Sequence, residues 1–242
     1  MENLFSKSRD FQEDVFRNIV SLRKSQDLFD DINDNNVALS ALATKIEATV
    51  KKDIPLGLIN RGFHYTTAIA YPFETDPFMK TRYGDGSYGV WYGSLTLNTS
   101  IYETAYHMMQ NESGIEGMIE PVIRERAVYK IFCHAILIDL TEQEFLYPEL
   151  IANEYHFTQH IGQRIQNEGH PGLLAPSARH SGVNSVIFNP NVLSNPRHYC
   201  YLTYTFYPLD ERVTVERTPG KILFNILKSD FARQRNSEII TT

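Results

Sequence analysis

Cysteine is scarce in this sequence, and the two residues present, Cys133 and Cys200, lie far apart. A disulfide framework needs several cysteines and a thiolate zinc site needs closely spaced ones, so we expect neither. No apolar run approaches membrane-spanning length, so we expect no membrane span. The first residues contain no apolar segment of the signal-peptide kind, and the predicted location is therefore the cytoplasm.

A basic stripe is also missing. Asp and Glu number 29 against 23 Lys and Arg, which gives a net charge of −6. A protein of this charge does not bind nucleic acid by neutralising phosphates, so no nucleic-acid partner is expected. What the chain does have is 42% hydrophobic and 12% aromatic residues. That content is sufficient for a sizeable core, so the sequence predicts a folded protein.

The first fifth of the chain has apolar residues at helical spacing. They occur in two stretches, at residues 11–22 and 39–50. Between them, residues 30–36 are rich in Asp and Asn, which favour turns and helix N-caps. We therefore predict an N-terminal helical extension over residues 1–52 and a main domain over residues 53–242.

After residue 52 the pattern changes to short β-like runs. The predicted strands cover residues 64–71, 88–97, 127–140, 183–188 and 198–207, and the predicted helices cover residues 99–110 and 149–167. Strands that do not alternate regularly with helices are typical of an α+β domain, not of a doubly wound parallel sheet. The predicted fold class is therefore α+β.

Two motifs in this region do not hold as functional signals. Residues 84–89 match the dinucleotide fingerprint G-x-G-x-x-G, but a strand-like run follows them where a helix should begin, so we predict a turn. His156 and His160 are spaced as two metal ligands on a helix would be. The zincin glutamate and a third ligand are missing, so we predict no metal site.

A third pattern favours a ligand site. Arginines, a tyrosine, one carboxylate and a serine are poor material for a hydrolytic triad but suit an anionic, sugar-bearing ligand. These candidate residues come from three separated segments: Arg61, Arg82, Tyr92, Glu103, Ser177 and Asn184. Glu103 lies in a predicted helix just after the strand that contains Tyr92, a corner that would present both side chains together.

The order of these residues resembles the RES-domain family, which is named for its Arg, Glu and Ser positions. The resemblance covers about residues 55–210 and includes the segments Val90-Trp91-Tyr92-Gly93, Ile101-Tyr102-Glu103-Thr104-Ala105 and Pro176-Ser177-Ala178-Arg179. In the family the second arginine usually stands in a Gly-Gly-Arg-Trp-like segment, whereas this chain has Thr81-Arg82-Tyr83-Gly84. The resemblance implies that residues 53–242 form a RES-like catalytic domain, and the helical extension has no counterpart in the short members.

The resemblance implies a fold similar to ADP-ribosylating toxins, with a split mixed β-sheet and peripheral helices. Members of the family are mostly toxins of bacterial toxin–antitoxin pairs, so a cognate antitoxin is an expected partner. The implied substrate is NAD, with nicotinamide as the leaving group and no metal. The oligomeric state, including a homo-oligomer, stays open.

The residues fit that chemistry. Cleavage of the nicotinamide–ribose bond builds positive charge on the ribose, and a carboxylate can stabilise it, which is the role expected for Glu103. Arg61 and Arg82 would bind the pyrophosphate. Tyr92 would stack on a ring or bind the ribose, and Ser177 would hold nicotinamide or a phosphate oxygen. Two weaker candidates, Arg179 and Asn184, would organise the loop around Ser177.

Three functions remain open from the sequence. The first is NAD cleavage with water or phosphate as acceptor, by a glycohydrolase or a phosphorylase. The second is mono-ADP-ribosyl transfer to a protein from the same site. The third is a non-catalytic module in which the N-terminal extension binds a partner.

Overall fold

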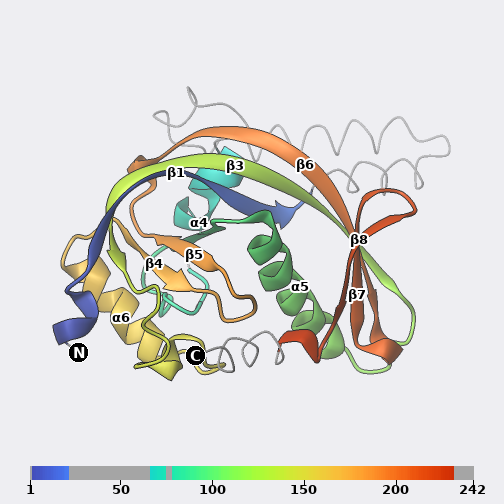
Figure 1. Cartoon of the computed structure of the whole chain (residues 1–242). Coiled ribbons are helices and arrows are strands. Elements are labelled where there is room, and N and C mark those ends of the chain that lie inside the picture. Colours follow the sequence, from blue (N-terminus) through green and yellow to red (C-terminus); the bar gives the residue numbers. More distant parts are fainter. Residues whose placement is uncertain (1, 22–65, 75–77, 232–242) are drawn as a thin grey trace, which may run out of the picture.

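A computed structural model of the chain describes residues 2–21, 66–74 and 78–231 (Figure 1). Its strands are β1 (Ser8–Val20), β2 (Trp91–Ser94), β3 (Val122–Asp139), β4 (Gly172–Pro176), β5 (Val183–Ile187), β6 (Leu193–Tyr207), β7 (Arg212–Thr218) and β8 (Lys221–Leu227). Its α-helices are α4 (Tyr71–Glu74), α5 (Leu97–Ser113) and α6 (His156–Asn167). Short helical turns are η1 (Glu2–Phe5), the π-helical η4 (Thr66–Ala70), η5 (Pro148–Leu150), η6 (Pro190–Val192) and η7 (Pro208–Asp210).

The described strands form one eight-stranded sheet in the order β1-β2-β5-β4-β3-β6-β7-β8, and β1 also pairs with β3. The pairing of β3 with β4 is parallel and the others are antiparallel, so the sheet is mixed. Because β1 contacts both β2 and β3, the first five strands of this order close on themselves. The predicted α+β fold with a mixed sheet and peripheral helices is confirmed.

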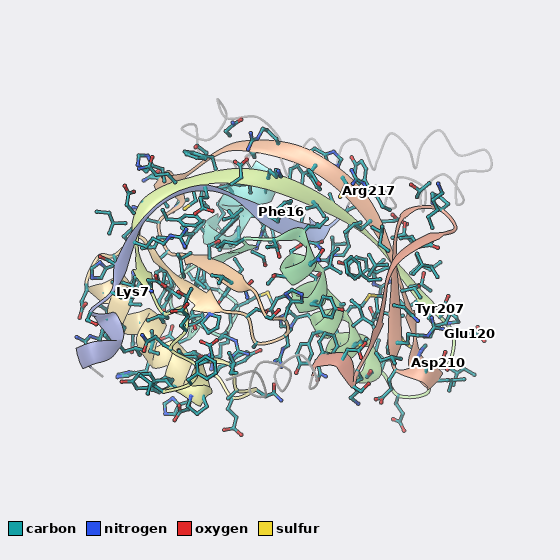
Figure 2. The ribbon with its side chains drawn as sticks, viewed as in Figure 1. Lys7, Phe16, Glu120, Tyr207, Asp210 and Arg217 are labelled. Atoms are coloured by element: carbon teal, nitrogen blue, oxygen red, sulfur yellow. The ribbon has the colours of Figure 1, made fainter. Side chains whose placement is uncertain are left out.

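The three longest strands arch over helix α5, with α6, β4 and β5 at one end and the β7–β8 hairpin at the other (Figure 1). Side chains fill the space beneath the arch, and the labelled Phe16 lies on β1 where that strand passes α5 (Figure 2). The α5 side chains in this core recur every three or four residues, at Ile101, Ala105 and Met108, with Met109 next to the last. On β6 the buried residues alternate instead: Cys200, Leu202, Tyr204 and Phe206.

The helical prediction for residues 11–22 is wrong over its described part, because residues 8–20 form β1. This strand pairs with β3 continuously, from Ser8 opposite Ile138 to Val20 opposite Arg126. Phe11 and Val15 are four residues apart, a spacing that fits a helix face and also one face of a strand. The second stretch, residues 39–50, lies outside the described residues, and the boundary at residue 52 stays a prediction.

Other predicted elements have mixed outcomes. The strand expected at residues 64–71 is wrong in its described part, where η4 and the start of α4 are helical. Helix α5 and strands β3, β5 and β6 confirm their predictions, and β2 occupies part of the predicted run. Helix α6 begins at His156, later than expected, and the turn predicted at residues 84–89 contains a bend at residues 86–88. In the described ranges, no helix is both long and apolar enough to cross a membrane.

Candidate active site

Glu103 lies on α5, on the side that meets the connection between β4 and β5. The helix begins after Thr96, whose hydroxyl accepts the amide hydrogen of Thr99 at 3.1 Å, so its start is fixed by an N-cap. One carboxylate oxygen of Glu103, Oε1, accepts two hydrogen bonds, at 2.6 Å from Ser177 Oγ and at 2.7 Å from Asn184 Nδ2. Three predicted residues, from two of the separated segments, therefore meet at one oxygen atom.

The β4–β5 connection is built to present Ser177 and Asn184. Ser177 directly follows β4, and its amide donates to the carbonyl of Gly182 at 2.7 Å, which closes the loop. The Ser177 hydroxyl oxygen accepts the amide hydrogens of Arg179 and His180, both at 3.1 Å. With these bonds on its oxygen, the hydroxyl has one hydrogen to donate, and that hydrogen goes to Glu103.

Asn184 is oriented by a second hydroxyl. Ser94 at the end of β2 donates to Asn184 Oδ1 at 2.7 Å, which leaves the amide nitrogen directed at Glu103. Strands β2 and β5 set this contact, because Ser94 and Asn184 are register partners. Nearby, a Cβ on Gly182 would lie 2.0 Å from Thr99 Oγ1, so only glycine lets this loop approach α5 so closely.

Arg82 is held by neutral groups. Its Nη1 donates to the carbonyl of Ala152 at 2.7 Å and to that of Leu150 at 3.2 Å. The guanidinium lies over the Tyr155 ring, 4.7 Å from its centroid. These contacts fix the direction of the side chain but leave its charge uncompensated by the groups that hold it.

Tyr92 connects β2 to the segment that carries Arg82. Its hydroxyl donates to Thr81 Oγ1 and accepts the amide hydrogen of Tyr83, both at 2.9 Å. Burial raises the pKa of Tyr92 to about 12, and the hydrogen bond from the Tyr83 amide and the charge of Arg82 act in the opposite direction, so the phenol stays protonated at neutral pH. The hydroxyl therefore forms hydrogen bonds with the residues immediately before and after Arg82 in the sequence.

Arg61 lies outside the described residues, so its place in the site stays a prediction. The sequence predicted Arg179 only as a weaker candidate that would organise the loop around Ser177. The guanidinium is buried, its carbon Cζ lies 3.4 Å from the centroid of the Tyr106 ring, and Nη1 donates to Asn153 Oδ1 at 2.7 Å. Tyr106 follows Glu103 on α5, so Arg179 lies along the same side of the helix.

His107 was also missed, although it follows Glu103 by one helical turn in a predicted helix. The imidazole is reachable by solvent, yet the surrounding protein lowers the pKa of His107, chiefly through lost solvation. Glu103 raises this pKa, while Arg179, Arg82 and Arg126 lower it. One carboxylate and several cations thus act on the same imidazole. The four-residue spacing of Glu103 and His107 on a predicted helix could have suggested the effect of the carboxylate.

His180 completes the surroundings of Glu103. Its Nδ1 lies 3.1 Å from Thr99 Oγ1, and its ring lies against Tyr102 at 4.9 Å between centroids. Burial lowers the pKa of His180, and Glu103 opposes the shift. Across the described ranges, no group of three or more His, Cys, Asp or Glu side chains could hold a metal ion.

A family model described as "RES domain" matches residues 55–207. The chain belongs to the RES domain family. All six predicted site residues fall within the matched part, whereas β1, β7 and β8 lie outside it. The RES match therefore includes the carboxylate and both of its hydrogen-bond donors.

No curated protein matches this RES-domain chain significantly. Among solved structures, the chain is similar to the one described as the crystal structure of the M. tuberculosis MbcT–MbcA toxin–antitoxin complex. The sequence identity is 11% and the TM-score 0.45, with 95% of this chain and 92% of that chain covered.

Proposed function

We propose that this RES-domain protein cleaves the nicotinamide–ribose bond of NAD, with water or phosphate as acceptor. The observation that carries the proposal is the fixed position of Glu103, whose Oε1 accepts from both Ser177 and Asn184. Among the described residues, Oε2 has no hydrogen-bond partner, which leaves one oxygen for a ribose hydroxyl. A carboxylate held in place before reaction needs little reorganisation when positive charge develops beside it.

The reaction needs one anionic group and no strong acid. As the C1′–N bond breaks, its electrons leave with nicotinamide, which departs neutral, and the ribose becomes oxocarbenium-like. Oε2 of Glu103 would bind the ribose 2′-hydroxyl and stabilise this cation. The acceptor oxygen then bonds to C1′, and water as acceptor also loses one proton to solvent or to a neighbouring base.

Binding of the dinucleotide falls to the arginines. Arg82 would donate to the pyrophosphate, with Arg61 as the second predicted donor. The contacts of Arg82 support this role, because neutral carbonyls and a tyrosine ring hold its guanidinium and no carboxylate among the described residues pairs with it. Tyr92 would serve mainly by fixing the segment of Arg82 through its hydroxyl.

The deciding experiment follows nicotinamide release from NAD by the purified full chain, with and without phosphate. Release by the wild type that is lost in Glu103→Gln supports the proposal, and a phosphate requirement identifies the acceptor. If no nicotinamide appears, labelled NAD in a cell lysate tests transfer to a protein. Absence of both activities would refute the proposal and favour the non-catalytic binding module.

The cellular part of the proposal is a toxin that depletes NAD in the cytoplasm and is held in check by a cognate antitoxin. Expression of the wild type should then lower cellular NAD and stop growth, whereas Glu103→Gln at equal abundance should do neither. Equal toxicity of the two proteins would contradict NAD depletion as the cause.

A further inference from the structure

Arg179 is a buried cation whose compensation by the described residues is incomplete. Its exposed fraction is 4%, and Asn153 Oδ1 is the one hydrogen-bond acceptor that the described residues offer its guanidinium, which carries five N–H donors. Across the same ranges no carboxylate lies within ion-pair distance of it. A largely buried guanidinium with unused donors costs free energy unless water or an anion completes its environment.

The position of Arg179 relates it directly to Glu103. Its backbone amide donates to Ser177 Oγ, and the same hydroxyl donates to Glu103. Its guanidinium stacks on Tyr106, three residues after Glu103 on α5. The side chain is therefore anchored to both elements that hold the carboxylate, without itself pairing with it.

His107 adds a second donor on the same side of α5. It follows Tyr106 directly, and its ring lies 5.7 Å from the Tyr106 ring between centroids. The side chain is exposed, and neither ring nitrogen has a hydrogen-bond partner among the described residues. An imidazole placed this way can donate one N–H to an incoming anion when neutral and has both ring nitrogens as donors when protonated.

We propose that Arg179 and His107 form an oxyanion subsite beside Glu103 that binds a group of the phosphate class. Arginine suits this ligand because its planar fork matches phosphate oxygens, and Tyr106 keeps the fork flat against the helix. The identity of this anion rests on the proposed function, which offers two sources. It is either a phosphate of the dinucleotide itself or free phosphate that serves as acceptor.

The test measures binding to the full chain by calorimetry, with inorganic phosphate and with ADP-ribose as separate probes. ADP-ribose carries the diphosphate but no nicotinamide, so binding is read without catalysis. Arg179→Met keeps the apolar stem over Tyr106 and removes the charged fork. The matched control is Arg164→Met, because Arg164 also covers a ring, that of Phe5, but lies on α6 as an exposed partner of Glu168.

Loss of charged hydrogen bonds should weaken binding by about tenfold or more in Arg179→Met, with the control unchanged. Weaker phosphate binding with unchanged ADP-ribose binding supports the subsite and names free phosphate as its ligand. Weaker ADP-ribose binding supports it and names the dinucleotide. Equal titrations for wild type and Arg179→Met with both probes would overturn the proposal.

Two further variants keep the test decisive if Arg179→Met does not fold. His107→Gln changes an exposed residue and should weaken the same titration by about threefold, the size of one neutral hydrogen bond. Arg179→Lys keeps a charge but loses the planar fork. Unchanged affinities in both would refute the subsite. A wild type that binds these probes but releases no nicotinamide would refute only the proposed reaction.

Discussion

The two sides of the site treat charge in opposite ways. On one side, the carboxylate cluster consists of Glu103, Ser177 and Asn184, and neutral donors hold a single negative group at 2.6 and 2.7 Å. On the other, the arginine cluster consists of Arg82 and Arg179. Neutral acceptors and tyrosine rings hold these cations, and among the described residues no carboxylate pairs with them.

Several exposed arginines differ from this pair, whereas the partly buried Arg17 and Arg126 are likewise held by neutral acceptors and aromatic rings among the described residues. Arg9, Arg164 and Arg197 each pair with a carboxylate at the surface. In water such pairs contribute little, roughly 0–1 kcal/mol. Among the described residues the arginine cluster has no such ion pair, although it is partly buried and a charge there acts more strongly. The difference teaches that the donors to Glu103 Oε1 are in place without a ligand, whereas no carboxylate among the described residues neutralises Arg82 or Arg179.

The largest effect should come from removing the charge of the carboxylate cluster. Glu103→Gln keeps the size of the side chain but cannot stabilise an oxocarbenium ion, so turnover should fall by roughly 10²–10³ or more. The measurement is nicotinamide release, with thermal unfolding to show that the fold is kept. Glu116→Gln, at an exposed position, is the matched control. Full activity of Glu103→Gln would remove the basis of the proposed mechanism.

Removing a charge from the arginine cluster should act on binding instead of turnover. Arg82→Ala should raise KM for NAD by about tenfold or more, because a charged hydrogen bond to the pyrophosphate is lost. The turnover number should change much less. Steady-state kinetics on both variants separate the clusters, and an unchanged KM would contradict the pyrophosphate role of Arg82.

A smaller effect on stability and KM is expected at Tyr92, the β2 residue that holds the segment of Arg82. Tyr92→Phe removes the hydroxyl that bonds Thr81 and the amide of Tyr83, and an unsatisfied buried amide costs about 1–3 kcal/mol. The melting temperature should fall by several degrees and KM should rise, since the segment of Arg82 loosens. Tyr207→Phe serves as a control outside the site. A stability equal to that of the wild type would show that these bonds are dispensable.

The smallest effect concerns protons. The pKa of His107 is lowered in the free protein, so its imidazole is neutral until the pH falls below that lowered value. A bound anion opposes the lowering, so the complex holds a proton at a pH where the free protein does not. Binding of phosphate should therefore take up protons and tighten as the pH falls, with no uptake at about pH 8, above the usual histidine pKa.

Calorimetry in two buffers of different ionisation enthalpy measures this uptake, and His107→Gln should reduce it. The neighbouring groups that titrate or carry charge are Glu103, Arg82, Arg179 and Arg126, together with Tyr106. His180 also has a lowered pKa, so His180→Gln distinguishes the two imidazoles. Identical uptake by wild type and His107→Gln would exclude His107 as the source.

Local sequence patterns predicted two of the elements that carry the carboxylate cluster, α5 with Glu103 and β5 with Asn184, but not β4, which Ser177 follows. The helix and the strand were readable because their patterns are properties of short segments. The same kind of reasoning was wrong for β1. The spacing of its apolar residues fits both a helix and a strand. Pairing with β3, more than a hundred residues away in the sequence, makes the segment a strand.

The sequence by itself determined the fold class, the order of Glu103, Ser177 and Asn184, and the family to which they belong. Only the tertiary structure decided that Ser177 and Asn184 donate to the same oxygen, because that geometry depends on the β2–β5 and β4–β5 registers. It also decided that Arg179 and His107 lie beside the carboxylate. A side chain's unused donors become visible only when its neighbours, distant in sequence, have been placed around it.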